Sequence, residues 1–191
     1  MLLHGTGGDE HDLVPLGRRL APGATLLSPR GKVLEAGMPR FFRRLAVGQL
    51  DIPDLLTRTD ELAAFVAAAT DAYQLDAERA VAVGLSNGAN IASSLLLRSV
   101  TLTHHVLRGA TLLLPMLPYE PEHRPELSGI DVLIAAGEHD PFSPPQSVRR
   151  LAEILSAAGA RVTATTEPGA SHNLNENDLQ RLTAWVHDLT A

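Results

Sequence analysis

Short apolar runs alternate with helical patterns along the whole sequence, and this alternation is the feature that most restricts the fold. The runs are typical of strands buried on both faces, while the segments between them place apolar residues at helical spacing. This order is typical of an α/β fold with a mostly parallel sheet. Strands are predicted at residues 1–3, 24–27, 80–83, 109–114, 132–136 and 161–166, and helices at residues 12–20, 54–73, 88–98, 147–158 and 177–189.

Two other local features complete this map. Residues 29–53 hold several Gly and Pro without a clean period, which predicts a long irregular excursion. A loop of this length in a compact domain is usually functional or disordered. Gly159 is expected to end the helix before it in the left-handed conformation. No internal repeat and no linker divides the sequence, so we predict a single domain over residues 1–191.

Composition excludes several classes of protein. The chain has 191 residues and is 45% hydrophobic, which is enough apolar material for a sizeable core. It contains no apolar run long enough for a transmembrane helix. The net charge of −6 argues against a broad basic surface for nucleic acid or anionic lipid. Cysteine is absent, which excludes disulfides, thiolate metal sites and a cysteine nucleophile.

A candidate nucleophile lies between a predicted strand and a predicted helix. Residues 84–88 read GLSNG and match G-x-S-x-G in the strand–turn–helix context that this motif requires. A serine on such a tight turn adopts strained backbone angles, and only small neighbours such as Gly84 and Gly88 leave room for it. The hydroxyl of Ser86 would then project above the sheet, near the positive end of the helix dipole. The alternative is an ordinary serine N-cap.

A serine nucleophile needs a base and an orienting carboxylate, and both candidates follow later strands. Asp140 lies on a turn after the strand at residues 132–136, although an Asx turn before proline is an alternative role. Glu138 is a rival acid that lies closer to the strand end. His172 is the only histidine between the last predicted strand and the last predicted helix, in the order serine, acid, histidine.

The glycine-rich turn at residues 4–8 (HGTGG) follows the first strand. Its glycines allow the backbone to turn so that N–H groups point into a site. The N–H groups of Thr6 and Asn87 are the predicted oxyanion donors. Phosphate binding is the alternative for such a loop, but the P-loop spacing and a nearby lysine are both lacking.

Together these residues resemble the α/β-hydrolase superfamily, and within it the phospholipase/carboxylesterase family, near the bacterial carboxylesterases linked to hydroquinone resistance. The resemblance spans most of the chain and rests on residues 2–8, 37–44, 84–90 and 135–141. It implies a three-layer sandwich with Ser86, His172 and Asp140 as a triad, no metal and no cofactor. It also implies hydrolysis of short carboxylic esters, with a small-molecule ester as the partner. Many such relatives are cytoplasmic and many form homodimers; no nucleic-acid or membrane partner is expected.

The same resemblance gives residues 29–53 a role. In related esterases the Gly-Met-Pro stretch, here residues 37–39, passes over the active site and lines the acyl pocket, so Met38, Phe41 and Phe42 would supply apolar walls. Alternatively, the two phenylalanines pin the loop to the core. Relatives that act on lipidated proteins or lysophospholipids usually carry an aromatic–acidic pair here. This chain has Arg40 and Arg43 instead, which either attract a substrate carboxylate or are solvated.

Two further interpretations remain open at this point. The same triad would serve another acyl hydrolase, such as a thioesterase, peptidase, lysophospholipase or dienelactone-like lactonase. A degenerate α/β-hydrolase used as a binding module is the non-enzymatic alternative, and its mark would be a broken triad. The sequence contains every triad position, which favours an enzyme.

The start of the sequence is short for such a fold. An α/β-hydrolase sheet normally carries one or two further strands before the His-Gly loop, and the strand leading into that loop is usually longer than residues 1–3. The sequence therefore suggests a fold that lacks the usual N-terminal strands, through truncation or a late start codon.

Overall fold

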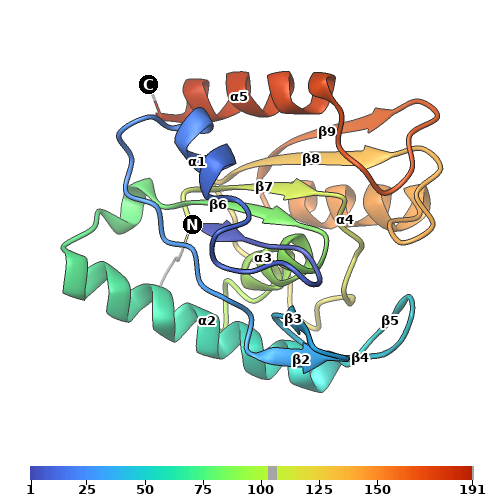
Figure 1. The fold of residues 1–191 in the computed structure, drawn as a ribbon, viewed down its shortest axis with the longest axis horizontal. Coiled ribbons are helices and arrows are strands. Elements are labelled where there is room, and N and C mark those ends of the chain that lie inside the picture. The colour runs from blue at the N-terminus through green and yellow to red at the C-terminus, as the bar shows by residue number, and fades with distance from the viewer. Residues whose placement is uncertain (103–106, 191) are drawn as a thin grey trace.

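A five-stranded parallel sheet occupies the middle of the molecule (Figure 1). The computed structural model describes residues 1–102 and 107–190. All four ladders are parallel, so the strands end at the same edge of the sheet. In spatial order the strands are β1 (Leu2–Leu3), β6 (Val81–Leu85), β7 (Gly109–Leu113), β8 (Asp131–Gly137) and β9 (Arg161–Glu167).

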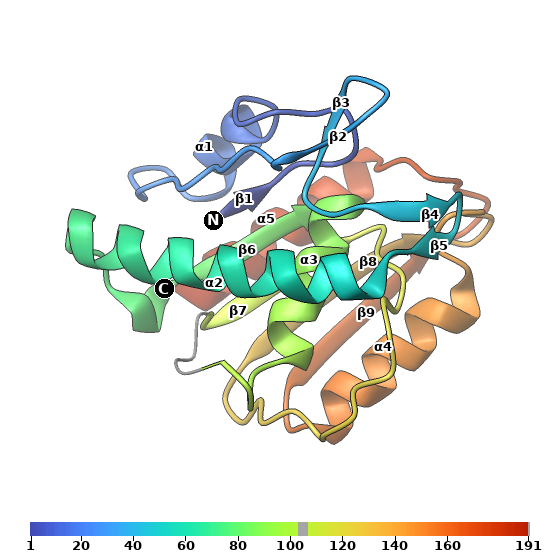
Figure 2. The same cartoon turned by 90° about the horizontal axis from the view of Figure 1, so that it is seen from below.

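Helices cover both faces of this sheet and make three layers (Figure 2). One face carries α1 (Val14–Leu20) and α5 (Glu176–Thr190). The other carries α2 (Ile52–Tyr73), α3 (Asn87–Leu97) and α4 (Pro145–Ala157). The short 3-10 helix η1 (Ala77–Arg79) precedes β6. No helix in the described ranges has the length and apolarity needed to cross a membrane.

The predicted α/β architecture is confirmed, because its buried strands and helices appear close to their expected positions. Every residue of β7 is buried, as a strand with helices on both faces requires. Gly159 follows α4 with φ of 100°, the left-handed conformation expected after a helix. The local patterns were sufficient here because β6, β7 and β8 are buried and largely apolar, and β9 is rich in β-branched residues.

The prediction of a strand at residues 24–27 is wrong. The segment passes beside β1, where the N–H of Leu2 donates to the carbonyl of Leu27 at 2.8 Å. It forms no ladder with the sheet, and β1 is paired with β6 alone. A single hydrogen bond does not make a strand, because a ladder repeats its bonds along the chain.

The expectation that residues 29–53 are irregular is also wrong. They form two antiparallel hairpins, β2 (Val33–Glu35) with β3 (Met38–Arg40) and β4 (Arg44–Ala46) with β5 (Gln49–Leu50). The first turn has positive φ at both Ala36 and Gly37, as tight two-residue hairpins prefer. Strands of two or three residues are too short to show a period, which explains why the pattern did not reveal them.

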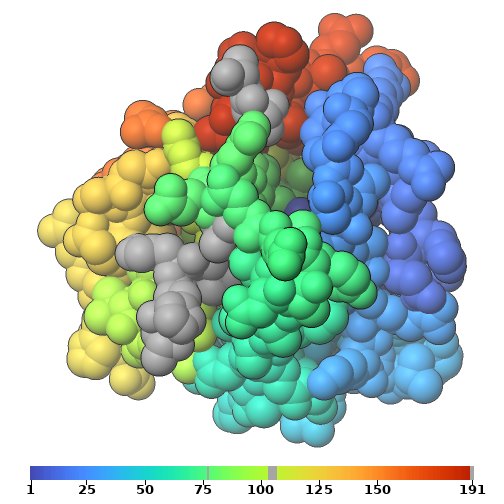
Figure 3. All heavy atoms as spheres, turned by 90° about the vertical axis from the view of Figure 1, so that its left-hand side faces the viewer, coloured from blue at the N-terminus to red at the C-terminus, as the bar shows by residue number. Residues whose placement is uncertain are grey.

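The polar turns after the strands gather at one end of the sheet. In Figure 1 the arrowheads point to the right, so the turns that follow β1, β6, β8 and β9 lie at that end. The opposite end faces the viewer in Figure 3, where the last turns of α2 (green) lie next to blue segments from the first part of the chain. The candidate chemistry is therefore confined to the end where the strands stop.

At the start of β8, Asp131 stabilises the sheet in a way that depends on pH. Arg161 donates to it from Nε and Nη2, both at 2.6 Å, and Arg108 donates at 2.8 Å. Hydrogen bonds from Arg161 first, and then from Arg108, hold the pKa of Asp131 below its ordinary value. A carboxyl group whose pKa is lower in the folded protein than in the unfolded chain stabilises the fold at pH values above its unfolded pKa. This stability is lost as the pH falls through the pKa of the folded protein.

We therefore expect Asp131→Asn to lower the melting temperature at neutral pH, because two arginines lose their anionic partner. The difference from wild type should shrink as the pH falls below about 4, where the wild-type carboxyl also loses its charge. Thermal unfolding followed by circular dichroism between neutral and acidic pH checks this. Asp71→Asn, at an exposed position of α2, is the matched control and should track wild type. A deficit that stays constant with pH would contradict the electrostatic explanation.

Candidate active site

Ser86 lies on the sharp turn between β6 and α3 with φ of 51° and ψ of −108°. This is a costly conformation for a residue other than glycine, of the order of 1–3 kcal/mol. The turn requires Gly88, because a Cβ there would lie 2.0 Å from the carbonyl oxygen of Leu3. It also requires Gly84, where a Cβ would lie 2.5 Å from the carbonyl oxygen of Gly88. Although Ser86 occupies the N-cap position of α3, its side chain makes no capping hydrogen bond.

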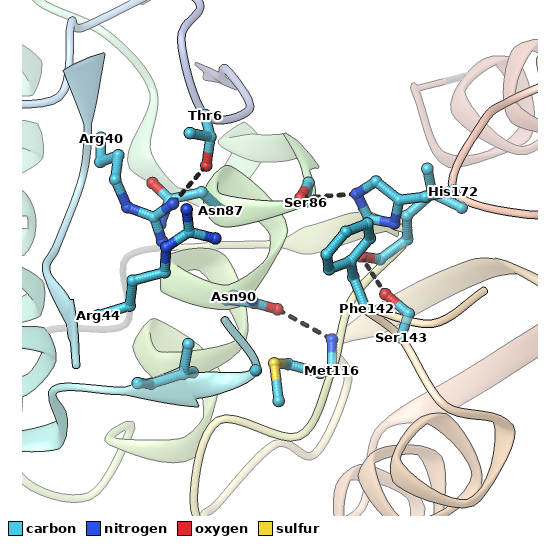
Figure 4. Close-up of a pocket in the computed structure, with 13 residues that line it drawn as sticks. Thr6, Arg40, Arg44, Ser86, Asn87, Asn90, Met116, Phe142, Ser143 and His172 are labelled. Atoms are coloured by element: carbon cyan, nitrogen blue, oxygen red, sulfur yellow. Dashed lines mark hydrogen bonds between the residues drawn. The ribbon is translucent and has the colours of Figure 1, made fainter. Parts of the chain in front are cut away.

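The hydroxyl of Ser86 is engaged by a histidine instead. Its Oγ lies 2.9 Å from Nε2 of His172, which follows β9. On the other side of the same ring, Nδ1 lies 2.6 Å from Oδ2 of Asp140, which follows β8. Three side chains from three separate loops thus form one continuous line of hydrogen bonds, visible in part in Figure 4.

The carboxylate of Asp140 has two functions in the fold. It is only 3% exposed. Its Oδ1 accepts from the backbone N–H groups of Phe142 at 2.8 Å and Ser143 at 3.1 Å, which is the turn geometry expected before a proline. Because Oδ1 satisfies the turn, Oδ2 is available to His172. The Asx-turn and the histidine-orienting interpretations therefore apply to different oxygens of one carboxylate.

The rival acid Glu138 has a different partner. It is exposed, and its Oε2 accepts from the N–H of Gly169 at 2.9 Å. The N–H of His139 donates to the carbonyl of Ala170 at 2.8 Å. These bonds tie the loop after β8 to the loop after β9, and so fix the position from which His172 reaches Asp140.

The two predicted oxyanion donors both line the same cavity. Thr6 lies in the turn after β1, and Asn87 is the first residue of α3. A first-turn N–H has no acceptor within its own helix, so the N–H of Asn87 is free to serve a ligand. The side chain of Asn87 is held elsewhere, since its Oδ1 accepts from the N–H of Phe41 at 2.7 Å.

The first hairpin braces the turn that contains Thr6. The N–H of Gly7 donates to the carbonyl of Pro39 at 2.9 Å, and Nη1 of Arg40 donates to Oγ1 of Thr6 at 2.6 Å. His4, at the start of the turn, is buried, and its Nε2 accepts from the N–H of Gly31 at 3.0 Å. The loop after β1 is therefore positioned by residues 31–40 as well as by the sheet.

A cavity of about 190 Å³ opens beside Ser86 and His172 (Figure 4). The ring of Phe142 packs edge-on against that of His172, with 5.1 Å between centroids. Within the described part of the chain, no cluster of three or more His, Asp or Glu side chains could hold a metal ion. The cavity is lined by Thr6, Arg40, Arg44, Gly48, Leu50, Ser86, Asn87, Asn90, Leu114, Met116, Phe142, Ser143 and His172.

Three residues expected to form apolar pocket walls do not line this cavity. Phe41 and Phe42 are buried in the main hydrophobic core, so they pin the loop to the core, as the alternative interpretation held. Met38 is 40% exposed and lies against the turn at Gly7. The expectation is corrected because each phenylalanine gains more from complete burial than from lining an open pocket.

Of the two arginines that the sequence offered for a substrate carboxylate, Arg40 lines the cavity and Arg43 does not. Arg43 is largely exposed and pairs with Asp51 at 3.1 Å and Asp54 at 3.6 Å. Its neighbour Arg44, which sequence reasoning missed, faces the cavity instead. The alternation of side chains along β4 was the available signal, but it requires knowledge that residues 44–46 form a strand.

The sequence did not point to three further residues that line the cavity, Asn90, Phe142 and Ser143. Asn90 lies one helical turn after Ser86 on α3, and its Oδ1 accepts from the N–H of Met116 at 2.9 Å. Phe142 and Ser143 belong to the turn that Asp140 caps. Helical spacing from Ser86 could have indicated Asn90, and closeness to Asp140 could have indicated the other two.

Comparison with known proteins reveals similarity along nearly the whole chain. No family model matches the sequence. It is 43% identical to the putative hydrolase MhqD of Bacillus subtilis over 188 residues, which span 98% of this chain and 92% of MhqD. The structure of the Bacillus cereus carboxylesterase is 43% identical with a TM-score of 0.92, covering 98% of this chain and 86% of that one. A carboxylesterase from Mesorhizobium loti is 37% identical with a TM-score of 0.86, over 97% and 86% of the two chains.

Proposed function

Because this chain belongs to the phospholipase/carboxylesterase family of the α/β-hydrolase superfamily, and is a hydrolytic enzyme with esterase function, we propose that it is a serine carboxylesterase for short-chain esters. In this proposal Ser86 is the nucleophile, His172 the general base and Asp140 the orienting acid. The observation that carries the proposal is the unbroken line of hydrogen bonds from Asp140 through His172 to Oγ of Ser86.

The proposed reaction uses each of these atoms in turn. Nε2 of His172 takes the proton of Ser86 while Oγ attacks the ester carbonyl. The tetrahedral intermediate collapses when His172 gives that proton to the departing alcohol, which leaves an acyl-enzyme. Water then enters and loses a proton to His172 while its oxygen attacks the acyl carbonyl. When this second tetrahedral intermediate collapses, the carboxylic acid leaves and His172 returns the proton to Oγ of Ser86. Throughout, Asp140 keeps Nδ1 protonated and stabilises the positively charged ring.

The backbone N–H groups of Thr6 and Asn87 are proposed to hold the oxyanion. Each such donor contributes about 3 kcal/mol to lowering the barrier. The start of α3 adds the positive end of its helix dipole at Asn87. The hydrogen bonds from Arg40 to Thr6 and from Phe41 to Asn87 support the proposal, since they brace both donor segments before substrate arrives.

The size of the cavity supports a short acyl group. At about 190 Å³ it is smaller than the clefts of roughly 300–1,000 Å³ that hold drug-sized ligands. Phe142, Met116 and Leu50 supply apolar lining. A short acyl chain fills such a space, whereas a long one extends out of it into water and gains little from burial.

A series of p-nitrophenyl esters from acetate to dodecanoate tests this function. We expect rapid release of p-nitrophenol, with kcat/KM highest for acetate to hexanoate and at least about tenfold lower for dodecanoate, because the cavity cannot bury the longer chain. Thioesters of the same acids, assayed in parallel, separate a carboxylesterase from a thioesterase. A preference for decanoate or longer chains would overturn the short-chain assignment. Absence of any p-nitrophenol release above the buffer rate would overturn the esterase itself.

A further inference from the structure

Two arginines and a single carboxylate meet at the wall of the cavity. Arg44 approaches Glu35 with 2.7 Å between Nη2 and Oε1, and Arg40 approaches the other oxygen with 3.3 Å between Nε and Oε2. Both arginines line the cavity, but Glu35 does not. Because arginine stays protonated in proteins, this cluster carries one uncompensated positive charge.

No other acidic group in the described lining compensates that charge. The residues that line the cavity include neither aspartate nor glutamate. The remaining partners of Arg40 are neutral: the hydroxyl of Thr6 at 2.6 Å and the carbonyl of Phe42 at 3.2 Å. Burial lowers the pKa of Arg40, while Glu35 opposes that shift and Arg44 adds to it. A buried guanidinium beside a second one is a costly arrangement that an anionic ligand would relieve.

Of the two arginines, Arg44 is the one free to bind such a ligand. Among the described residues, Glu35 is its only hydrogen-bond and ion-pair partner, through Nε at 2.9 Å and Nη2 at 2.7 Å. Its Nη1 therefore has no partner among the described residues. The side chain is 24% exposed, whereas that of Arg40 is 5% exposed and committed to the turn after β1. Figure 4 shows both guanidinium groups directed toward the middle of the cavity.

The position of Arg40 and Arg44 indicates which part of an ester substrate, the alcohol or the acyl group, they would contact. His172 must protonate the departing alcohol, so the alcohol part of an ester lies beside His172. The acyl part then extends from Ser86 in the other direction. In Figure 4 Arg40 and Arg44 lie on the side of Ser86 away from His172. An anion held by them would therefore belong to the acyl group.

We propose that Arg44, supported by Arg40, binds a carboxylate at the far end of the acyl chain, so that the preferred substrates are half-esters of short dicarboxylic acids. This inference rests on the proposed esterase function and narrows its substrate class. Hydrolysis consumes water and yields the free alcohol and the dicarboxylate. Arg44 is well suited to this role because its planar guanidinium presents several donors to a carboxylate.

A pair of isosteric esters tests the proposal. Monomethyl glutarate carries a carboxylate, and methyl 4-carbamoylbutanoate carries an uncharged amide of the same shape; methanol release is measured for both at low ionic strength. We expect wild type to favour the carboxylate by about tenfold or more in kcat/KM, as charge-assisted hydrogen bonds allow. The preference should lie mainly in KM and should weaken at high salt. Equal kcat/KM for the two esters would overturn the proposal.

Variants of Arg44 test whether this side chain causes the preference for the carboxylate-bearing ester. In Arg44→Met the ratio of the two kcat/KM values should fall to near one, and Arg44→Lys should retain part of it because a charge remains. Using a ratio cancels any general loss of activity. Arg150→Met removes a positive charge from the exposed face of α4 and is the matched control, with an unchanged ratio expected. A preference that survives in Arg44→Met would contradict the assignment.

The anion claim and the esterase claim can fail separately. If p-nitrophenyl butyrate is hydrolysed but the two glutarate-derived esters react equally, only the carboxylate preference is wrong. If no ester is hydrolysed, the proposed function fails, and titration calorimetry with glutarate still tests the cavity. Binding of glutarate to wild type and its loss in Arg44→Met would then support an anion site, whereas no binding would overturn it.

Discussion

Ser86→Ala is expected to lower kcat for p-nitrophenyl butyrate by at least about 10⁴-fold, because no other atom replaces Oγ as the attacking group. The backbone donors and the cavity remain in this variant, so a small rate above the uncatalysed reaction should persist. Steady-state and burst kinetics measure the effect. In wild type, a fluorophosphonate probe should add its mass to the peptide that contains Ser86, and the variant should remain unlabelled.

Several comparisons make this result specific to the proposed chemistry. His172→Ala should lose about as much activity as Ser86→Ala, and the double variant should lose little more, since the two side chains act as a unit. Ser156→Ala, at an exposed serine of α4, is the matched control and should retain wild-type activity and labelling. Activity of Ser86→Ala within about tenfold of wild type would show that another residue is the nucleophile.

Gly88→Ala is expected to produce the largest loss of stability, about 3 kcal/mol or more, or to prevent folding. The added methyl carbon would lie 2.0 Å from the carbonyl oxygen of Leu3 and 2.7 Å from that of His4. Both contacts are with the backbone of β1 and the turn after it, so no side chain can rotate to relieve them. The free energy of unfolding from urea denaturation measures this effect.

Gly5→Ala is the matched control for this substitution. A Cβ at Gly5 would meet its nearest atoms at 3.6 Å, which is ordinary van der Waals contact, and we expect a change in unfolding free energy below about 1 kcal/mol. If Gly88→Ala unfolds at the same urea concentration as wild type, the close approach of α3 to β1 is not essential. In that event the glycines of the GLSNG segment need another explanation.

The site shows which kinds of inference a sequence supports. Ser86, Asp140 and His172 were selected as candidates because each follows a predicted strand of a parallel sheet, and such strands end at one edge. The structure brings His172 within hydrogen-bonding distance of both Asp140 and Ser86. The choice between Asp140 and Glu138 was harder, because both lie in the same loop. Burial and hydrogen bonding distinguish the two residues in the structure.

The cavity wall was less accessible to prediction. Phe41 and Phe42 were expected to face the substrate, but both rings are buried in the hydrophobic core. Arg43 was considered for a substrate carboxylate, whereas Arg44 faces the cavity. A shift of one residue in a strand reverses the face on which a side chain lies, so the short hairpins had to be known before either assignment could be made.

By itself the sequence determined the alternation of strands and helices, the parallel sheet, the strained serine turn and the order of the three candidate residues. These properties depend on local periodicity, on glycine spacing and on the common direction of parallel strands. Only the tertiary structure decided which arginines reach the cavity, that the phenylalanines belong to the core, and that Glu35 is shared by two guanidinium groups. These outcomes arise from packing between segments distant in sequence, where the register of short hairpins and competition for buried space select one arrangement.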